Sequence, residues 1–482
     1  VSSPVKHRTG RHRSRVWTFG LVAVLGLFGV TPNRLFGQIL FFEDFDADHT
    51  ANWAVNASPG THPVNVFFDY SSVGIPSAPN SGGTTRGLKL QANTAGNVLG
   101  GVSVSPLGQN FTGNYRLHFD LWMNFNGPLN GGGNGTTQFG GAGVGVTGAT
   151  PQWSGSSGLE GVWFAWTGEG GTTADYRAYS ANSNNYVPAS SVYFAGTSTS
   201  PDARNGSHPY YSGFGSKTAP AVQLSAYAQQ TGSTPVGTLG FTWLDVTVTK
   251  SGNQITWAIN GLPFAKVDAS SFALSTNILF NYFDLNSTTS TDPNAPALLF
   301  ALIDNVRVEV VPALFTVTGG GADCTGVPVG LSGSETAVEY RLSRGGLFTG
   351  QIVTGTGGAL SFGNQTSSGV YTVIASNVIS AATITMSGSA SVTINQSPAI
   401  TSGPTPASTV KSAGESVAFT ITASGAGLGY QWQRDGTNLP NGGSISGATS
   451  STLTINPVQP TDATDAGHGY TCVVNGTCAP AA

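Results

Sequence analysis

Charged and sulfur-containing residues are scarce in this chain of 482 residues. Lys, Arg, Asp and Glu together make up only 9%, and there are three Cys and two Met. Low charge alone would fit a disordered chain, but disordered chains are also poor in aromatic residues, which reach 10% here. No stretch with helical periodicity stands out after residue 37. Many short strands between turns rich in Gly, Ser, Thr and Asn explain this composition, so the sequence predicts an all-β protein with two or three domains.

The shortage of cysteine limits the possible cross-links. Cys324, Cys472 and Cys478 are an odd number, so in a secreted chain at least one is unpaired or pairs outside the chain. A local Cys472–Cys478 bridge across a hairpin is one option, whereas Cys324 has no obvious partner within its own unit. No Cys and His cluster has the spacing of metal ligands, which argues against a zinc site.

The first 37 residues have the features of a secretory signal peptide. A basic flank precedes an apolar run from Val16 to Val30, and a small residue follows at Gly37. The run is shorter than the roughly 20 residues of a membrane-spanning helix. An uncleaved anchor is the alternative, and bulky Leu35 leaves the cleavage point open. We therefore expect a secreted protein, either extracellular or at the cell surface.

Removal of residues 1–37 would make the chain acidic. That segment holds six of the 19 Lys and Arg and no acid, so 13 basic residues would face 23 acidic ones, a net charge of −10. An acidic surface without a basic stripe argues against nucleic acid as a partner. It also argues against attachment to anionic lipid, and no membrane insertion beyond the signal peptide is expected.

Residues 241–268 form the clearest β pattern. Apolar residues alternate in Trp243–Val248 and Ile255–Ile259, and Asn260–Gly261 suits a tight turn. Such a meander needs a second sheet to cover its dry face. The pattern resembles the late strands of concanavalin A-like or laminin-G-like jelly rolls, over residues 38–312. The resemblance implies that the first and last strands pair, and further strands are expected at Tyr115–Phe125, Leu159–Trp166, Tyr193–Phe194, Val222–Tyr227 and Ile278–Phe283.

Two further units follow. Residues 313–397 contain short strands, including Gly369–Val373, and resemble the Ig-like repeats of bacterial surface adhesins. Residues 398–482 resemble an immunoglobulin domain, because Trp432 suits its core strand and Tyr470 lies two residues before Cys472. Ile421 stands where the first Cys of the inter-sheet disulfide would be, so this unit must rely on packing around the tryptophan. The resemblance also predicts a last strand beyond Ala482.

One aromatic and polar cluster in the jelly-roll unit is the candidate ligand site. Residues 161–171 hold two tryptophans and a Gly-rich turn, and an Asp-Tyr-Arg triplet follows. Secreted β-sandwiches hold sugars with flat aromatic faces and a few planar hydrogen-bonding groups. The alternative is that the tryptophans point to opposite faces of one strand and at least one is core. The candidate ligand-binding residues are Trp163, Trp166, Glu169, Asp175, Tyr176, Arg177, Tyr210 and Tyr211.

Acidic residues at the ends of the jelly-roll unit suggest a structural calcium ion. Glu43, Asp46 and Asp304 would come close if the first and last strands pair, and calcium takes six to eight oxygen ligands. A second oxygen-rich loop runs from Asp284 to Asn294. Solvated turns are the alternative explanation for both groups of residues.

The evidence for catalysis is weaker. Glu160 and Glu169 are the nearest pair of carboxylates that could act as acid and base on a polysaccharide. The Glu-x-Asp-x-x-Glu strand of jelly-roll glucanases is absent, as are a Gly-x-Ser-x-Gly elbow and a phosphate loop.

The sequence favours a non-catalytic role in carbohydrate binding or adhesion, with polysaccharide, surface glycan or other surface proteins as partners. A polysaccharide-degrading enzyme and a structural component without a specific ligand are the two alternatives.

Overall fold

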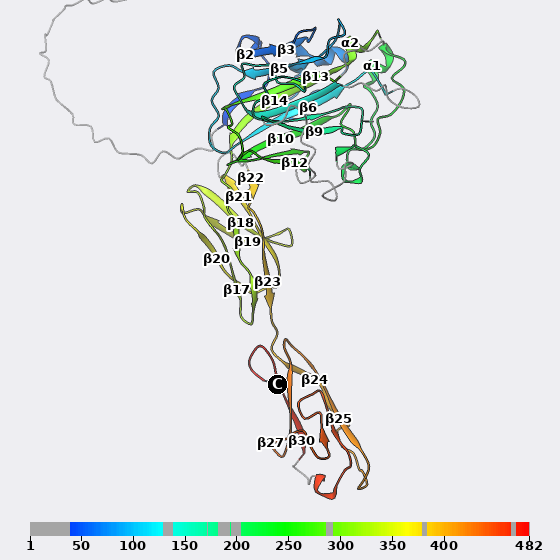
Figure 1. The fold of residues 1–482 in the computed structure, drawn as a ribbon, viewed down its shortest axis with the longest axis vertical. Helices are drawn as coiled ribbons and strands as arrows, with labels where there is room; N and C mark the ends of the chain where they lie inside the picture. The colour runs from blue at the N-terminus through cyan, green and yellow to red at the C-terminus, as the bar shows by residue number, and fades with distance from the viewer. Residues whose placement is uncertain are drawn as a thin grey trace, which may run out of the picture. The chain divides into compact units, whose positions relative to one another are not determined.

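Strands dominate every described part of the chain in the computed structural model (Figure 1). The structure describes residues 39–128, 138–170, 172–181, 193, 204–285, 293–377, 383–463 and 469–481. The predicted signal peptide lies outside these residues. The strands fall into three groups, each with two sheets of its own, which confirms the all-β prediction of a jelly-roll sandwich followed by two Ig-like sandwiches. The unit limits at residues 312 and 397 stay predictions.

The first group of strands, here called the head, contains an eight-stranded sheet. Its order is β12-β11-β10-β6-β14-β4-β3, and β1 pairs with β14 in the antiparallel sense, as predicted for the first and last strands. The strands are β1 (Ile39–Glu43), β3 (Val64–Asp69), β4 (Arg86–Leu90), β6 (Tyr115–Asn124), β10 (Trp243–Ser251), β11 (Gln254–Ile259), β12 (Leu262–Asp268) and β14 (Phe300–Val310).

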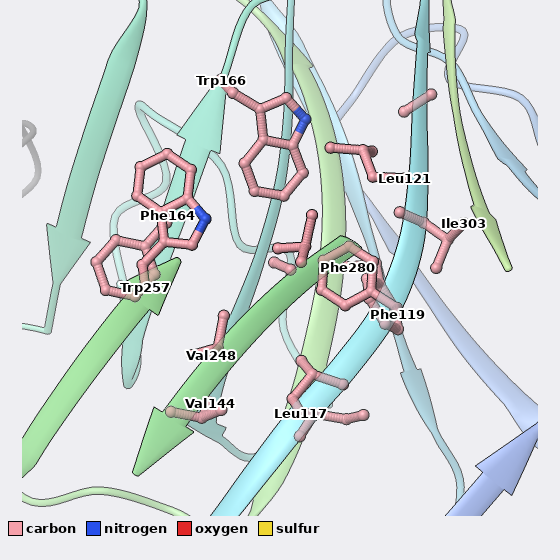
Figure 2. Packing of buried hydrophobic residues seen from close by; sticks show 14 of the residues in the cluster. Leu117, Phe119, Leu121, Val144, Phe164, Trp166, Val248, Trp257, Phe280 and Ile303 are labelled. Carbon is pink, nitrogen blue, oxygen red and sulfur yellow. The ribbon is translucent and has the colours of Figure 1, made fainter. Parts of the chain in front are cut away.

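The second sheet of the head has six strands in the order β2-β5-β13-β7-β8-β9. They are β2 (Trp53–Ala57), β5 (Gly100–Pro106), β7 (Gln138–Val146), β8 (Val162–Trp166), β9 (Tyr176–Ser180) and β13 (Asn277–Asp284). Large side chains from both sheets fill the space between them, among them Phe119, Trp257 and Phe280 (Figure 2). Burial of this apolar area is the main force that holds the two sheets together.

The predicted meander is confirmed in detail. In β10, Leu244 and Val246 are buried whereas Asp245 between them is exposed, as a strand with one dry face requires. Asn260 and Gly261 at the turn before β12 have φ of 50° and 76°, the left-handed conformation that these residue types accept.

One predicted strand is wrong, because residues around 222–227 form the short helix α1 (Ala221–Ala226). Its apolar Val222 is 56% exposed, whereas Gln223 is buried and donates to the Asn124 side chain at 2.8 Å. The buried amide of Gln223, rather than a stripe of apolar side chains, holds helix α1 against the rest of the head. A second short α-helix among the described residues is α2 (Ala295–Leu298). Among the described residues, no helix is long and apolar enough to cross a membrane.

The second group of strands, the middle sandwich, has sheets of three and six strands. Tyr340 and Tyr371 are fully buried in its core. The strands are β15 (Val317–Gly319), β16 (Gly321–Asp323), β17 (Val327–Leu331), β18 (Val338–Arg344), β19 (Leu347–Thr354), β20 (Leu360–Gln365), β21 (Gly369–Asn377), β22 (Thr383–Thr385) and β23 (Ala390–Ile394).

The third group, the C-terminal sandwich, packs around Trp432, which has no exposed surface. The Tyr470 hydroxyl donates to the Asp462 carbonyl at 3.0 Å, the bond expected of a tyrosine corner. Ile421 lies in the same core as Cys472, so packing replaces the inter-sheet disulfide. The strands are β24 (Ala399–Thr405), β25 (Val417–Ser424), β26 (Gly429–Arg434), β27 (Thr437–Asn438), β28 (Ile445–Ser446), β29 (Thr452–Ile455) and β30 (Tyr470–Asn475).

The cysteines do not form the local bridge considered from the sequence. Cys324 is bonded to Cys478, and Cys472 is a buried free thiol. Cys472 lies on β30 among the core residues, where burial raises the pKa of its thiol.

Candidate functional site

The two tryptophans of the candidate site lie on opposite faces of β8. Trp166 faces the space between the sheets, with its ring centroid 5.6 Å from that of Trp257. Trp163 faces the other way and stacks on Tyr179 at 3.9 Å. Both indoles are 0% exposed. Neither therefore has a face open to a ligand, and stacking of sugar on these two side chains has no support from their positions.

Glycines in β7 explain why the outer indole fits so closely. A Cβ atom added at Gly143 would lie 2.2 Å from the Trp163 Cβ, and one at Gly141 would lie 2.2 Å from the Asn281 side chain. Real side chains do not approach so closely, so the missing Cβ atoms make room for an apolar layer on the outer face of the six-stranded sheet. Phe139 and Phe283 belong to the same layer and stack at 5.5 Å.

Asp175 is a buried carboxylate that connects two loops far apart in the sequence. It is 1% exposed and accepts hydrogen bonds from the backbone and side chain of Thr172 at 3.1 and 3.0 Å. Its other oxygen accepts the Gly206 N–H at 2.7 Å. Because these bonds reach Thr172 on one side and Gly206 on the other, residues 167–170, 172–175 and 204–214 are held together. We call these segments the Asp175-braced loops.

Tyr176 on β9 and Tyr211 within the braced loops are buried side chains that pack together. Their rings are 4.6 Å apart, and the Tyr176 hydroxyl donates to the Gly237 carbonyl. Both side chains are almost fully buried, and burial raises the pKa of both hydroxyls well above the usual value. They support the loops as neutral groups and do not face outward.

Arg177 and Tyr210 are the candidate residues that keep part of their surface open. The Arg177 guanidinium lies over the Phe139 ring at 4.2 Å, and its Nε donates to the Ala174 carbonyl at 2.9 Å. The Tyr210 hydroxyl donates to the Pro263 carbonyl at 2.7 Å. Each group is thus fixed in orientation and still half-exposed, which suits contact with a polar ligand.

The two candidate catalytic carboxylates lie at opposite ends of β8. Glu169 follows the strand and is 4% exposed, whereas Glu160 precedes it and accepts hydrogen bonds from Thr147 and Thr150. The five residues of β8 alone span roughly 17 Å, whereas paired carboxylates of glycosidases stand about 5 to 9.5 Å apart. Glu160 and Glu169 therefore cannot act together on one glycosidic bond.

The predicted calcium ligands are occupied by other partners. Glu43 is buried and accepts hydrogen bonds from Phe45 N at 2.9 Å and from His49 Nδ1 at 3.0 Å. This bond with the Glu43 carboxylate raises the pKa of His49. Asp304 accepts the Tyr70 hydroxyl at 2.9 Å, and Asp46 is exposed.

No group of three or more His, Cys, Asp or Glu within the described residues is placed to hold a metal ion, so the prediction of a calcium site from these residues is not supported. In the second oxygen-rich loop, Asn286 and Asp292 lie outside the described residues.

Sequence reasoning missed a row of acids across the eight-stranded sheet. Asp120 on β6 lies opposite Asp245 on β10 and opposite Asp304 on β14. Asp120 accepts hydrogen bonds from the side chains of Asn80 and Asn305, both at 2.8 Å. Burial, together with the charges of Asp120 and Asp46, raises the pKa of Asp304 to about 7. The alternation in β6 could have placed Asp120 on the outer face, but only the covering segment around Tyr70 explains its burial.

Comparisons with known proteins give weak likenesses. The sequence matches no protein-family model and no curated protein. Among solved structures, a Bacillus subtilis protein of unknown function with a galectin-like fold covers 57% of this chain and 96% of its own, at 7% identity and a TM-score of 0.29. The metal-free carbohydrate recognition domain of Emp46p covers 56% and 95%, at 8% identity and a TM-score of 0.30.

A titin fragment, I67–I69, covers 49% of this chain and 87% of its own, at 14% identity and a TM-score of 0.25. All three TM-scores lie below 0.5, so no conclusion about this chain is drawn from them.

Proposed function

We propose that the head is a non-catalytic module of a secreted or cell-surface protein that binds polysaccharide or surface glycan and so mediates adhesion. The Asp175-braced loops and the adjoining start of β9 are its contact surface, with Arg177 on β9 and Tyr210 in the loops as the groups that meet the ligand. The two Ig-like sandwiches act as spacers. Calcium is not part of this proposal, because the side chains of Glu43 and Asp304 are held by His49 and Tyr70.

The observation that carries the proposal is the bracing of both loops by one buried carboxylate. Loops that are already ordered lose little conformational entropy when they bind, so even a few polar contacts can give measurable affinity. Sugars need planar hydrogen-bonding groups and an aromatic face beside them. Arg177 supplies a planar fork of donors, and Tyr210 supplies a half-exposed ring.

A glycan array probed with the full chain tests this proposal. We expect binding to one class of polysaccharide and a loss of at least about tenfold in affinity for Arg177→Ala or Tyr210→Ala, equal to about 1.4 kcal/mol. Arg86→Ala is the matched control, because the Arg86 guanidinium also lies over an aromatic ring, Phe67, at 4.4 Å but on β4 of the other sheet. Absence of binding to every glycan, or equal loss in all three variants, would contradict the proposal.

A further inference from the structure

The disulfide between Cys324 and Cys478 closes an unusually large loop of chain. The two cysteines are 154 residues apart in the sequence. Cys324 directly follows β16 in the middle sandwich, and Cys478 follows β30 in the C-terminal sandwich. The loop therefore contains strands β17 to β23 and the entire set from β24 to β30. Neither the adhesion proposal nor the two cores require a bond with this connectivity.

The chain around both cysteines is fixed by local contacts. Strand β16 runs parallel to β23, with Asp323 opposite Ile394, and Asn395 N–H donates to the Asp323 carbonyl at 2.9 Å. On the other side, the Ser397 hydroxyl donates to the Ala479 carbonyl at 3.0 Å. The chain that enters the C-terminal sandwich thus lies beside both ends of the disulfide.

We infer that this disulfide is a tension bypass that protects the C-terminal sandwich, and the part of the middle sandwich that follows Cys324, when the chain is pulled at its ends. Tension that reaches Cys324 from the head passes through the sulfur–sulfur bond to Cys478. A covalent bond carries this tension, whereas the chain from residue 325 to 477 is closed off by it and is not stretched. Ladders between two strands of this closed segment therefore need not resist the pull, whereas the ladders of β15 with β17 and of β16 with β23 still bear it, because β15 and β16 precede Cys324. The inference holds whether or not the head binds glycan.

The covalent connectivity sets the size of the expected effect. Fully extended chain spans roughly 3.6 Å per residue, so a loop with a sequence separation of 154 hides about 550 Å of extension. A Cys472–Cys478 bridge, in contrast, would hide only about 20 Å. The two pairings therefore differ by more than twentyfold in a length that can be measured directly.

Single-molecule pulling on the full chain, held at its two ends, measures this length. We expect oxidised protein to extend about 550 Å less than reduced protein when all domains are unfolded. The double variant C324S/C478S should reach the reduced length without reductant. Cys472→Ala is the matched control and should keep the shorter length, because that thiol is not in the bond.

A second measurement does not depend on the folding of any variant. A dithiol reductant is added to oxidised wild-type chain held under tension; it gives two electrons and two protons to the disulfide, yields two thiols and itself becomes a cyclic disulfide. Cleavage should release the hidden chain as further lengthening of about 550 Å in total. No lengthening, or a step near 20 Å, would overturn the inference.

Discussion

The six-stranded sheet of the head and the C-terminal sandwich differ in how many faces of their strands are buried. In β29 of the C-terminal sandwich, buried Leu453 and Ile455 alternate with half-buried threonines. In β13 of the head, all eight residues are buried. The difference arises because an apolar layer that includes Trp163 covers the outer face of the head sheet. Where both faces of a sheet are packed, strands lose their alternation and aromatic residues become core.

The cover over the head sheet also supplies polar contacts. The Asn281 side chain on β13 points away from the space between the sheets and donates to the Gln152 carbonyl at 2.9 Å. Trp153 packs on the outer apolar layer. A segment that satisfies a buried amide and adds an indole to the layer is part of the fold. The head therefore has packed layers on both sides of this sheet, whereas the C-terminal sandwich has one core.

The largest expected effect is in the C-terminal sandwich, which depends on one side chain. Trp432→Ala removes a fully buried indole whose Nε1 donates to the Ser450 carbonyl at 2.9 Å. We expect a loss of about 3–5 kcal/mol in the free energy of unfolding, enough to abolish the separate melting transition of this sandwich in calorimetry. Val410→Ala, at a side chain that is 98% exposed, is the control and should leave the transition in place. An unchanged transition in Trp432→Ala would show that the core does not depend on the indole.

The buried Asp304 of the head should make the stability of this unit depend on pH. The pKa of Asp304 is about 7 in the folded head, above its ordinary 3.8, so the protonated group stabilises the fold fully below pH 3.8. This contribution is lost as pH rises through 7, by up to about 4 kcal/mol. We expect Asp304→Asn to gain stability relative to wild type as pH rises from 4 to 8, measured by thermal melting at each pH.

Asp268→Asn is the control for this pH series. A hydrogen bond from the Ser270 backbone lowers the pKa of the Asp268 carboxyl below its ordinary 3.8, so this group does not titrate near pH 7. The stability difference between this variant and wild type should stay constant from pH 5 to 8. A constant difference for Asp304→Asn as well would show that Asp304 is already ionised in the folded head at pH 4.

Asp175 and Glu160, the carboxylates near the two ends of β8, should differ by a smaller but measurable amount in what they contribute to the free energy of unfolding. Asp175→Asn turns an amide toward the donors of Thr172 and Gly206, and leaving a buried donor without an acceptor costs about 1–3 kcal/mol. Glu160→Gln makes the same change at a more exposed site, where we expect less than about 1 kcal/mol because water can replace the lost bond. Chemical denaturation of both variants measures the difference, and equal losses would contradict the bracing role of Asp175.

Alternation in the sequence predicted the meander of residues 241–268, which has one dry face and is confirmed. The pairing of the first and last strands and the Tyr470 corner were predicted from the resemblances to jelly rolls and immunoglobulin domains, and both are confirmed. The burial of a sheet face by segments distant in the sequence could not be predicted. Nothing in the local pattern of residues 161–166 distinguishes an exposed indole from one that a distant loop covers.

Contacts between segments distant in the sequence also explain why the roles of the candidate site residues and the pairing of the cysteines could not be predicted. The cluster of residues 169–177 was found, but its members divide into buried supports such as Asp175 and outward groups such as Arg177 only once the loop at Gly206 is in place. The Cys324–Cys478 bond joins two units, so no spacing within one unit could indicate it.

The burial of Trp163 tests the central claim most directly. Fluorine NMR of the full chain with 5-fluorotryptophan, assigned with Trp163→Phe and Trp243→Phe, can be recorded with a soluble paramagnetic probe. We expect the Trp163 signal to keep its width while that of Trp243, a half-buried side chain, broadens. Broadening of the Trp163 signal by the paramagnetic probe would show an open aromatic face and contradict the packed outer layer. A shift of the Trp163 signal when a glycan ligand is added would contradict it as well.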